Sequence, residues 1–134
     1  MGQLAARKTD QVVGSDTHLV LVPSATGTVP TLLPGHVFSG KIGSKTWGDV
    51  KIEGQAAATV DSQAQNSPSH VPVPPGTSFV NPPSNRGTVS SGSGTVRIHG
   101  KAAARMGDPV RTCNDPADTD AATITTGASS VRIG

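Results

Sequence analysis

The stretch VRIHGKAAARMGDPVRTC, residues 96–113, predicts a strand, a tight turn and an alanine-rich strand, followed by a Gly-Asp-Pro break and the only cysteine. Parts of it recur twice. GQLAARKTD at residues 2–10 aligns without gaps on residues 100–108, and VKIEGQAAAT at residues 50–59 repeats the strand and the turn. Repeats of this kind decide the architecture before any other feature does. The sequence therefore predicts one β-hairpin unit present three times in an all-β chain.

The first copy lacks the strand that should precede its turn. SSVRIG at residues 129–134 resembles GTVRIHG at residues 94–100, so we expect the last strand to pair with the first and close a ring. Closure removes exposed strand edges. Glu53-Gly54 and His99-Gly100 are expected at two-residue hairpin turns, which need positive φ angles. We therefore interpret His99 as a turn residue and not as a ligand.

Each copy is followed at short range by a side chain that can bind a soft metal. His18 and His70 each lie eleven residues after the alanine strand ends, and Cys113 lies eight residues after it. His36 in LLPGH is a fourth candidate. Three histidines and one cysteine form a complete tetrahedral zinc shell of the closed, structural type. We predict one structural zinc ion bound by His18, His36, His70 and Cys113, close to an axis of pseudo-threefold symmetry.

The composition agrees with a small domain that needs a bound metal for stability. With 134 residues, a net charge of +2, 16 glycines and 11 prolines, we expect one domain over residues 1–134, without a toxin extension. Small chains with few apolar residues are commonly stabilised by disulfides or metals. One cysteine cannot form a disulfide within the chain, which leaves the metal.

Several functional classes are disfavoured. The pI is near 9.0, but the eleven basic residues are scattered and the aromatic residues are one Trp and two Phe, so we expect no nucleic-acid binding. No apolar stretch is long enough for a membrane span, and no signal peptide is visible at the N-terminus. We expect synthesis in the cytoplasm and, if the protein is exported, a route that uses no signal peptide.

Turn and strand residues predict the structure of the remaining segments. DTHLVLVP at residues 16–23 is expected to be a strand, and residues 23–40 a loop that carries His36 near its end. Trp47 is expected to pack against that loop, with exposure as a docking aromatic as the alternative. Residues 66–86 hold six of the eleven prolines and predict a stiff, extended surface segment that begins near His70.

The alanine-arginine units resemble the PAAR-repeat proteins, named for Pro-Ala-Ala-Arg. Residues 102–105 read Ala-Ala-Ala-Arg and residues 4–7 read Leu-Ala-Ala-Arg, so alanine replaces proline, and Thr59 replaces the arginine in the middle copy. DTHLVLVP, LLPGHVFSG and TCNDPAD extend the likeness over nearly the whole chain. These motifs are similar to the PAAR-like tip proteins of extracellular contractile injection systems of the antifeeding-prophage type, which are related to type VI secretion tips.

This resemblance implies a small cone of short β-hairpins with zinc near its point. Its base would sit, as a monomer, on a homotrimeric spike of the valine-glycine-repeat type, and its point would contact the target membrane transiently. The particle that carries it would be released or exposed extracellularly. Three histidines and one cysteine are the family's zinc ligands, which matches the four residues named above. Because their strands lie far from those ligands, Ile52, Ile98 and Ile133 are expected at the base.

Other classes of function stay open at this point. A zinc-dependent hydrolase or effector would need an open coordination position and a general base, and Glu53 is the only glutamate. A nucleophilic Cys113 paired with a histidine is a second enzyme hypothesis, without a supporting motif. A passive interaction module or metal buffer is a third. We expect a structural protein and not an enzyme.

Overall fold

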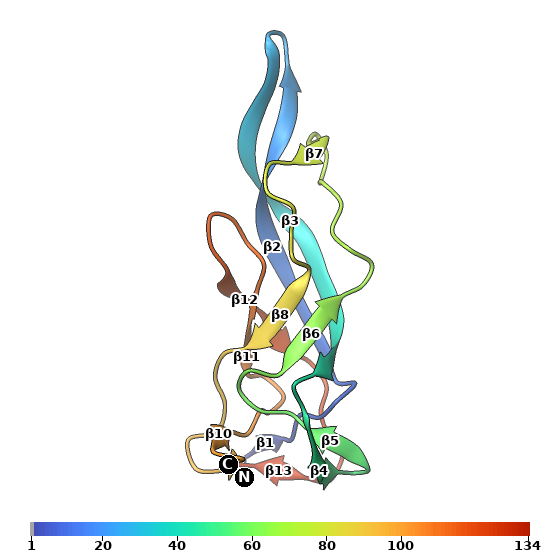
Figure 1. The fold of residues 1–134 in the computed structure, drawn as a ribbon, viewed down its shortest axis with the longest axis vertical. Helices are drawn as coiled ribbons and strands as arrows, with labels where there is room; N and C mark the ends of the chain where they lie inside the picture. The colour runs from blue at the N-terminus through green and yellow to red at the C-terminus, as the bar shows by residue number, and fades with distance from the viewer. Residues whose placement is uncertain (1) are drawn as a thin grey trace.

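The computed structural model describes residues 2–134, which form strands and contain no helix (Figure 1). The all-β prediction is confirmed, and the alanines of residues 102–105 are not helical. No segment of residues 2–134 is a helix of the length and hydropathy needed to cross a bilayer. The strands are β1 Gln3–Leu4, β2 Gln11–Ser24, β3 Gly27–Ser44, β4 Trp47–Ile52, β5 Gln55–Ala57, β6 Gln63–Asn66, β7 Ser78–Phe79, β8 Arg86–Val89, β9 Arg97–Ile98, β10 Lys101–Ala102, β11 Pro109–Thr112, β12 Thr119–Ile124 and β13 Arg132–Ile133.

Three short hairpins form the broad end of the molecule. β4 pairs with β5 and β9 pairs with β10, and the predicted turn residues have positive φ: 50° and 83° at Glu53 and Gly54, 53° and 79° at His99 and Gly100. β1 pairs with β13, with Gln3 opposite Ile133. Both predictions, the two turns and the pairing of the chain ends, are confirmed. The termini and these six strands lie together at one end, which we call the base (Figure 1).

A closed ring of backbone hydrogen bonds joins the three copies. The N–H of Ala6 donates to the carbonyl of Ala104 at 3.0 Å, Ala104 donates to Ala58 at 3.0 Å, and Ala58 donates to Ala6 at 3.2 Å. All three residues are fully buried. Three strands that approach one axis this closely leave room for a methyl group and little more, because protein interiors are close-packed. This crowding explains why every copy carries alanines.

A tight turn follows each alanine strand, at residues 7–10, 59–62 and 105–108. In each, the N–H of the fourth residue donates to the carbonyl of the first, at 3.0–3.1 Å. The third residue has positive φ in all three: 80° at Thr9, 78° at Asp61 and 94° at Gly107. The pseudo-threefold repeat is therefore kept in the backbone even where the side chains differ.

The middle copy has lost an arginine and its carboxylate together. Arg7 and Arg105 each form an ion pair with the aspartate three residues later, and that aspartate also accepts their backbone N–H at 2.7 and 2.8 Å. At Thr59 the acceptor is the hydroxyl of Ser62, at 3.0 Å. The turn needs an oxygen at this position, and a serine hydroxyl supplies it without leaving an unpaired charge.

Trp47 occupies the space beside the missing arginine. Its indole N–H donates to the Thr59 hydroxyl at 3.0 Å, and its ring stacks on His99 with centroids 4.0 Å apart and an interplanar angle of 15°. The expected packing of Trp47 against a loop of residues 23–40 is therefore wrong. The Trp47 side chain instead connects Thr59 of the middle copy to His99 in the turn of the third copy. With Thr59 in place of an arginine, no long side chain from position 59 reaches His99.

Above the ring the chain forms a closed six-stranded barrel. The pairing order is β12-β11-β8-β6-β3-β2, and β2 pairs back onto β12. The barrel interior contains the larger apolar cluster: Ala6, Val12, Phe38, Ile42, Ala58, Ala64, Val89, Ala104, Val110, Ala122 and Ile124. Closure leaves no free edge within the barrel itself.

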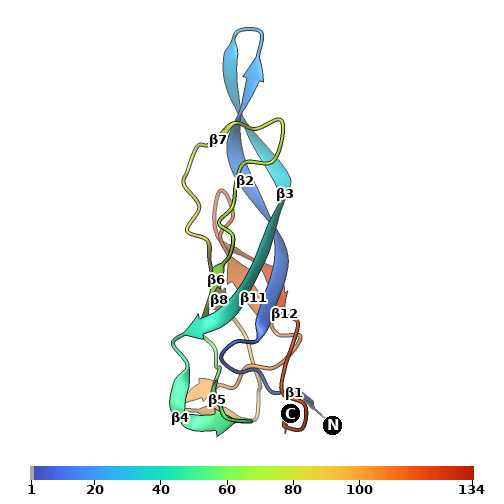
Figure 2. The ribbon, with the colours of Figure 1, turned by 90° about the vertical axis from the view of Figure 1, so that its right-hand side faces the viewer.

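The predicted loop over residues 23–40 is wrong. β2 and β3 form one long hairpin whose pairing runs without a gap from His18 and Leu33 to the turn at Ser24 and Gly27. Pro23 and Pro30 do not interrupt it. Hydrogen-bonded and non-hydrogen-bonded pairs alternate in an antiparallel ribbon, and both prolines occupy positions whose missing N–H would point away from the partner strand. This hairpin projects beyond the barrel, opposite the base (Figures 1 and 2).

A second apolar cluster lies at the base. It contains Ala5, Ile52, Ala57, Ala103, Ala128 and Ile133, with Val50, Ile98 and Val131 packed against it. Ile52 and Ile133 are 7% and 6% exposed, and Ile98 is half-buried. The isoleucines predicted for the base do lie there, but two of them face inward. Their role in docking stays a prediction.

Enlarging any ring alanine is expected to destabilise the fold. Ala6→Leu, Ala58→Leu and Ala104→Leu should each lower the free energy of unfolding by about 1–3 kcal/mol or more, because overpacking displaces the strands that meet there. Urea denaturation measures this. The three variants should behave alike, whereas Ala117→Leu in an exposed loop should have little effect. A large loss at one ring position only would contradict the threefold equivalence.

Glu53 should give a distinct acid sensitivity. Its carboxylate accepts hydrogen bonds from the hydroxyl and N–H groups of Ser130 and Ser129, and these lower its pKa from 4.5 to about 2. The resulting stability is present above pH 4.5 and is lost as the pH falls toward 2. Glu53→Gln should therefore have a lower Tm than the parent at pH 7, with the two Tm values converging near pH 2. A pH-independent difference would refute this.

Candidate metal centre

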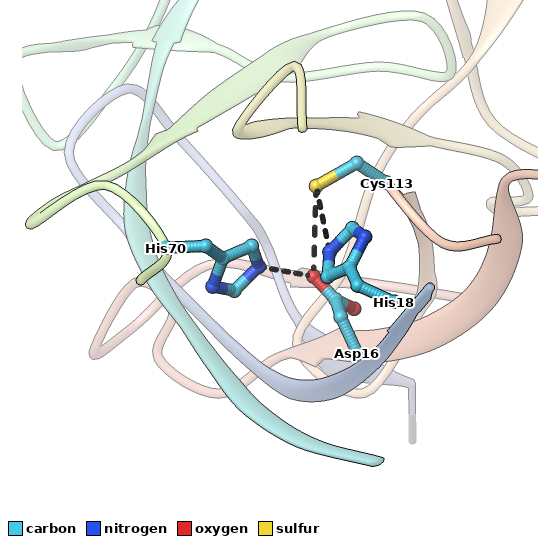
Figure 3. A group of neighbouring side chains, drawn as sticks. All are labelled: Asp16, His18, His70 and Cys113. Carbon is cyan, nitrogen blue, oxygen red and sulfur yellow. Dashed lines mark hydrogen bonds and ion pairs between the residues drawn. The ribbon is translucent and has the colours of Figure 1, made fainter. Parts of the chain in front are cut away.

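Three excursions leave the barrel at its narrow end, and each contributes to one buried cluster. The long hairpin carries Asp16 and His18 on β2, the proline-rich segment begins near His70, and the loop after β11 begins at Cys113. Asp16 and His18 are two residues apart on a strand, so their side chains share a face. One ligand-type atom from each of the four residues lies within 4.8 Å of the other three (Figure 3).

The distances within the cluster are close to those of a coordination shell. The carboxylate Oδ2 of Asp16 lies 2.8 Å from Nε2 of His70 and 3.7 Å from Sγ of Cys113, and that sulfur lies 3.8 Å from Nε2 of His18. Bond lengths of about 2.0–2.3 Å in a tetrahedral zinc site place ligand atoms about 3.3–3.6 Å apart. The four residues are 0–9% exposed. The four potential metal ligands are thus close together and buried from solvent.

Neighbouring side chains fix the orientation of the donors. The other oxygen of Asp16 accepts from the Thr112 hydroxyl at 2.5 Å and from the Asn114 amide at 3.2 Å. The amide nitrogen of Asn66 lies 3.2 Å from Nδ1 of His70 and also donates to Asn85 at 3.0 Å. Such surrounding hydrogen bonds orient metal-binding side chains.

The protonation equilibria are strongly shifted. Burial lowers the pKa of His70, but hydrogen bonds to Asp16 and Cys113 outweigh it and raise that pKa to about 9. Burial raises the pKa of the Cys113 thiol, but hydrogen bonds to His18 and His70 outweigh it and lower the pKa to about 7. The cluster therefore stabilises a thiolate beside a protonated imidazole. A divalent ion can replace the protons in such a set.

His36 lies against the cluster without completing it. Its ring centroid is 5.0 Å from that of His18 and 5.8 Å from that of His70. Its Nε2 accepts the N–H of Val73 at 3.2 Å, and burial, together with the charge of His18, lowers its pKa. The structure thus brings together His18, His70 and Cys113, places His36 beside them, and adds Asp16.

Asp16 was not among the predicted ligands, although the sequence held a signal for it. In Asp16-Thr17-His18 the aspartate is two residues before a candidate ligand, which places both on one face of any strand. Zinc accepts carboxylate oxygen as well as nitrogen and sulfur. His99 lies in its turn, and its Nε2 is hydrogen-bonded to the Asp49 carboxylate at 2.8 Å, away from the cluster, as expected.

Unpaired imidazole nitrogens beside the cluster are an independent observation that fits a bound metal ion. Within residues 2–134, the Nδ1 atoms of His18 and His36 are the two buried side-chain polar atoms that have no hydrogen-bond partner. Nδ1 of His18 faces Asp115 Oδ2 at 3.5 Å, outside hydrogen-bonding geometry, while Nε2 of the same ring faces the Cys113 sulfur. Nε2 of His36 accepts from Val73, which leaves its Nδ1 without a partner. Buried polar groups are normally paired. A metal bound by His18, His70 and Cys113 would tie the three excursions together.

The family model of the PAAR motif matches residues 81–134. This range contains the third hairpin, ring residue Ala104, Cys113 and closing strand β13. No curated protein matches the sequence.

Ligand variants should define the metal shell. Purified protein is expected to contain one zinc ion per chain by elemental analysis, and His18→Gln, His70→Gln and Cys113→Ser should each lose most of it. Comparing His36→Gln with Asp16→Asn identifies the fourth donor, because only removal of a true ligand weakens binding by orders of magnitude. His99→Gln is the matched control. Full metal content in Cys113→Ser would refute the site.

Metal affinity should depend on pH in two steps. Between pH 7 and 9 binding must displace the proton of His70, so the affinity should rise about tenfold per pH unit. Below pH 7 the thiol proton must be displaced too, and the dependence should steepen to about 100-fold per unit. Competition titrations with a chelator of known proton affinity measure both slopes. A pH-independent affinity between 5 and 9 would contradict the assignment of these two residues.

Proposed function

We propose that this chain, which belongs to the PAAR-motif proteins, is the metal-stabilised tip that caps the trimeric spike of a contractile injection system. The observation that carries the proposal is the ring of Ala6, Ala58 and Ala104 above three equivalent hairpins. A single chain with threefold backbone geometry at its base can present one hairpin to each protomer of a homotrimer. This removes the symmetry mismatch between a monomer and a spike of the valine-glycine-repeat type.

The base has the chemistry of a docking face. Its apolar layer is continuous with the buried cluster that contains Ile52 and Ile133, and Ile98 and Val96 are partly accessible there. Stable interfaces combine an apolar centre with a polar rim. Glu53 in the β4–β5 turn and Lys101 on β10 place charged groups at the same end. Seating on a spike would cover it.

The opposite end suits passage through a membrane. The molecule narrows from the base to a single hairpin, and four buried donor residues hold the three excursions together behind it (Figures 1 and 3). We propose that the tip helps to pierce the target membrane. We further propose that the protein is made in the cytoplasm, assembled into the particle and then exposed or released extracellularly, as the extracellular type of system requires.

A structural role for the metal is supported by its surroundings. The side chains of Asp16, His18, His70 and Cys113 are 0–9% exposed, and hydrogen bonds already occupy the second oxygen of Asp16. A zinc-dependent hydrolase or effector would need an open coordination position and room for a substrate. We therefore propose that the protein is not an enzyme.

Docking can be tested with one base variant and one matched control. Ile98→Asp should weaken binding to the purified spike trimer at least about tenfold, since a charge would be buried at the interface. Val13→Asp places the same charge on the barrel, where Val13 is 40% exposed, and should bind normally. Both variants should keep the parent metal content.

Ile98 is chosen because it is half-buried, whereas Ile52→Asp would bury a carboxylate in the fold itself. Binding is measured by size-exclusion chromatography with mass determination, which should give one chain per three spike protomers. Three chains per trimer, or normal binding by Ile98→Asp and weak binding by Val13→Asp, would overturn the proposed orientation.

A further inference from the structure

Two stretches of the chain, residues 17–40 and 62–85, contain no Asp, Glu, Lys or Arg, although 15% of the whole chain is charged. They are far apart in sequence but meet in space, because β7 pairs with β2 at Val20 and Leu21. Figures 1 and 2 show β7 and the paired ends of β2 and β3 at the end opposite the base, whereas β6 lies in the barrel. We call residues 19–37 and 71–80 the uncharged cap. On the solvent-exposed surface of a soluble domain, about 25–35% of the residues are usually charged.

The uncharged cap also exposes most of the large apolar side chains that reach solvent. Among residues 2–134, seven large hydrophobic side chains are exposed, and five of them belong to the cap. The five are Val29 at 49%, Leu32 at 50%, Val37 at 64%, Val71 at 74% and Val80 at 40%. Scattered apolar residues on a surface need no explanation, but five of seven within two segments that carry no charge mark these segments as a candidate interaction surface.

The backbone of the cap argues against a protein strand as its partner. The outer edge of β2 is already used, since Thr77 and Val80 donate their N–H groups to the carbonyls of Leu21 and Leu19. Pro30 removes an outward N–H from the edge of β3, and Pro23 does the same on β2 beyond the reach of β7. A strand that adds to a sheet needs such donors along the edge.

We propose that the uncharged cap binds the interfacial region of a zwitterionic lipid bilayer at equilibrium, before and without any mechanical thrust. This deepens the proposed membrane role of the tip and rests on it. Lipid interfaces accept exposed Val and Leu side chains without specific geometry, and the lack of charge on the cap favours neutral headgroups over anionic ones.

The length of the hairpin limits how deep it reaches. From Leu21, where pairing with β7 ends, to the turn after Ser24 is about four residues, or about 14 Å at 3.4 Å per residue. Interfacial segments bury their apolar face about 5–10 Å into the headgroup and acyl boundary. A two-stranded ribbon leaves backbone groups unpaired at its edges and therefore cannot cross the hydrocarbon core alone. The uncharged cap is therefore expected to bind at the lipid–water interface and not to span the bilayer.

The test uses the full metal-loaded chain and vesicles of pure phosphatidylcholine in a flotation assay. The parent protein should float with the vesicles equally at about 50 and 500 mM salt, since no ionic contact is involved. Val29→Trp should show a blue shift of its added fluorescence on vesicle addition. The emission of Trp47, which lies at the base, should not change in the parent protein and serves as an internal control.

Charge placed on the cap should abolish the interaction. The double variant Val29→Glu/Leu32→Glu should lower the partition coefficient at least about tenfold, whereas Val13→Glu, with similar exposure on the barrel, should leave it unchanged. Both should bind the spike normally, so failure of lipid binding is separable from failure of the capping role. The proposal is overturned if the parent protein does not float, if it needs anionic lipid, or if Val13→Glu lowers binding as much as the double variant.

Discussion

Three backbone hydrogen bonds, from Ala6 to Ala104, from Ala104 to Ala58 and from Ala58 to Ala6, hold the centre of this molecule. Segments about fifty residues apart in the chain meet there, so the ring fixes the order of the three hairpins below it and the six barrel strands above it. It also restricts the sequence. Alanine is required by the close approach of the strands, which keeps the core thin and leaves little apolar area for stabilisation.

The narrow end depends on a second closure of a different kind. The long hairpin, the proline-rich segment and the loop after β11 leave the barrel and bury few large side chains, but they deliver His18, His70 and Cys113 to one place. Asp16 and Cys113 are 97 residues apart in the chain. A metal bound across such separations would stabilise the folded state directly, because no preformed site exists in the unfolded chain. The base is held by packing and hydrogen bonds, whereas the narrow end has few large buried side chains and is expected to depend on the metal.

Repeats made much of this structure predictable. The three hairpins, the turns at Glu53-Gly54 and His99-Gly100 and the pairing of residues 129–134 with the N-terminus follow from local self-similarity, which the backbone preserves. The long hairpin of β2 and β3 was not predicted. Prolines in its two strands resemble those of a loop unless the direction of each backbone N–H is known. Asp16 and the stacking of Trp47 on His99 depend on contacts between distant segments, which periodicity does not encode.

Two separate closures, the alanine ring and the metal-binding cluster, are expected to hold this molecule, and hydrogen exchange of the protein with and without bound metal tests this most directly. Removing the bound metal with a chelator should increase exchange in residues 66–85 and 113–118. The amides of Ala6, Ala58 and Ala104 should stay protected, because the ring does not contain the ligands. Loss of protection in the ring together with the narrow end, or no change anywhere when the metal is removed, would contradict the account.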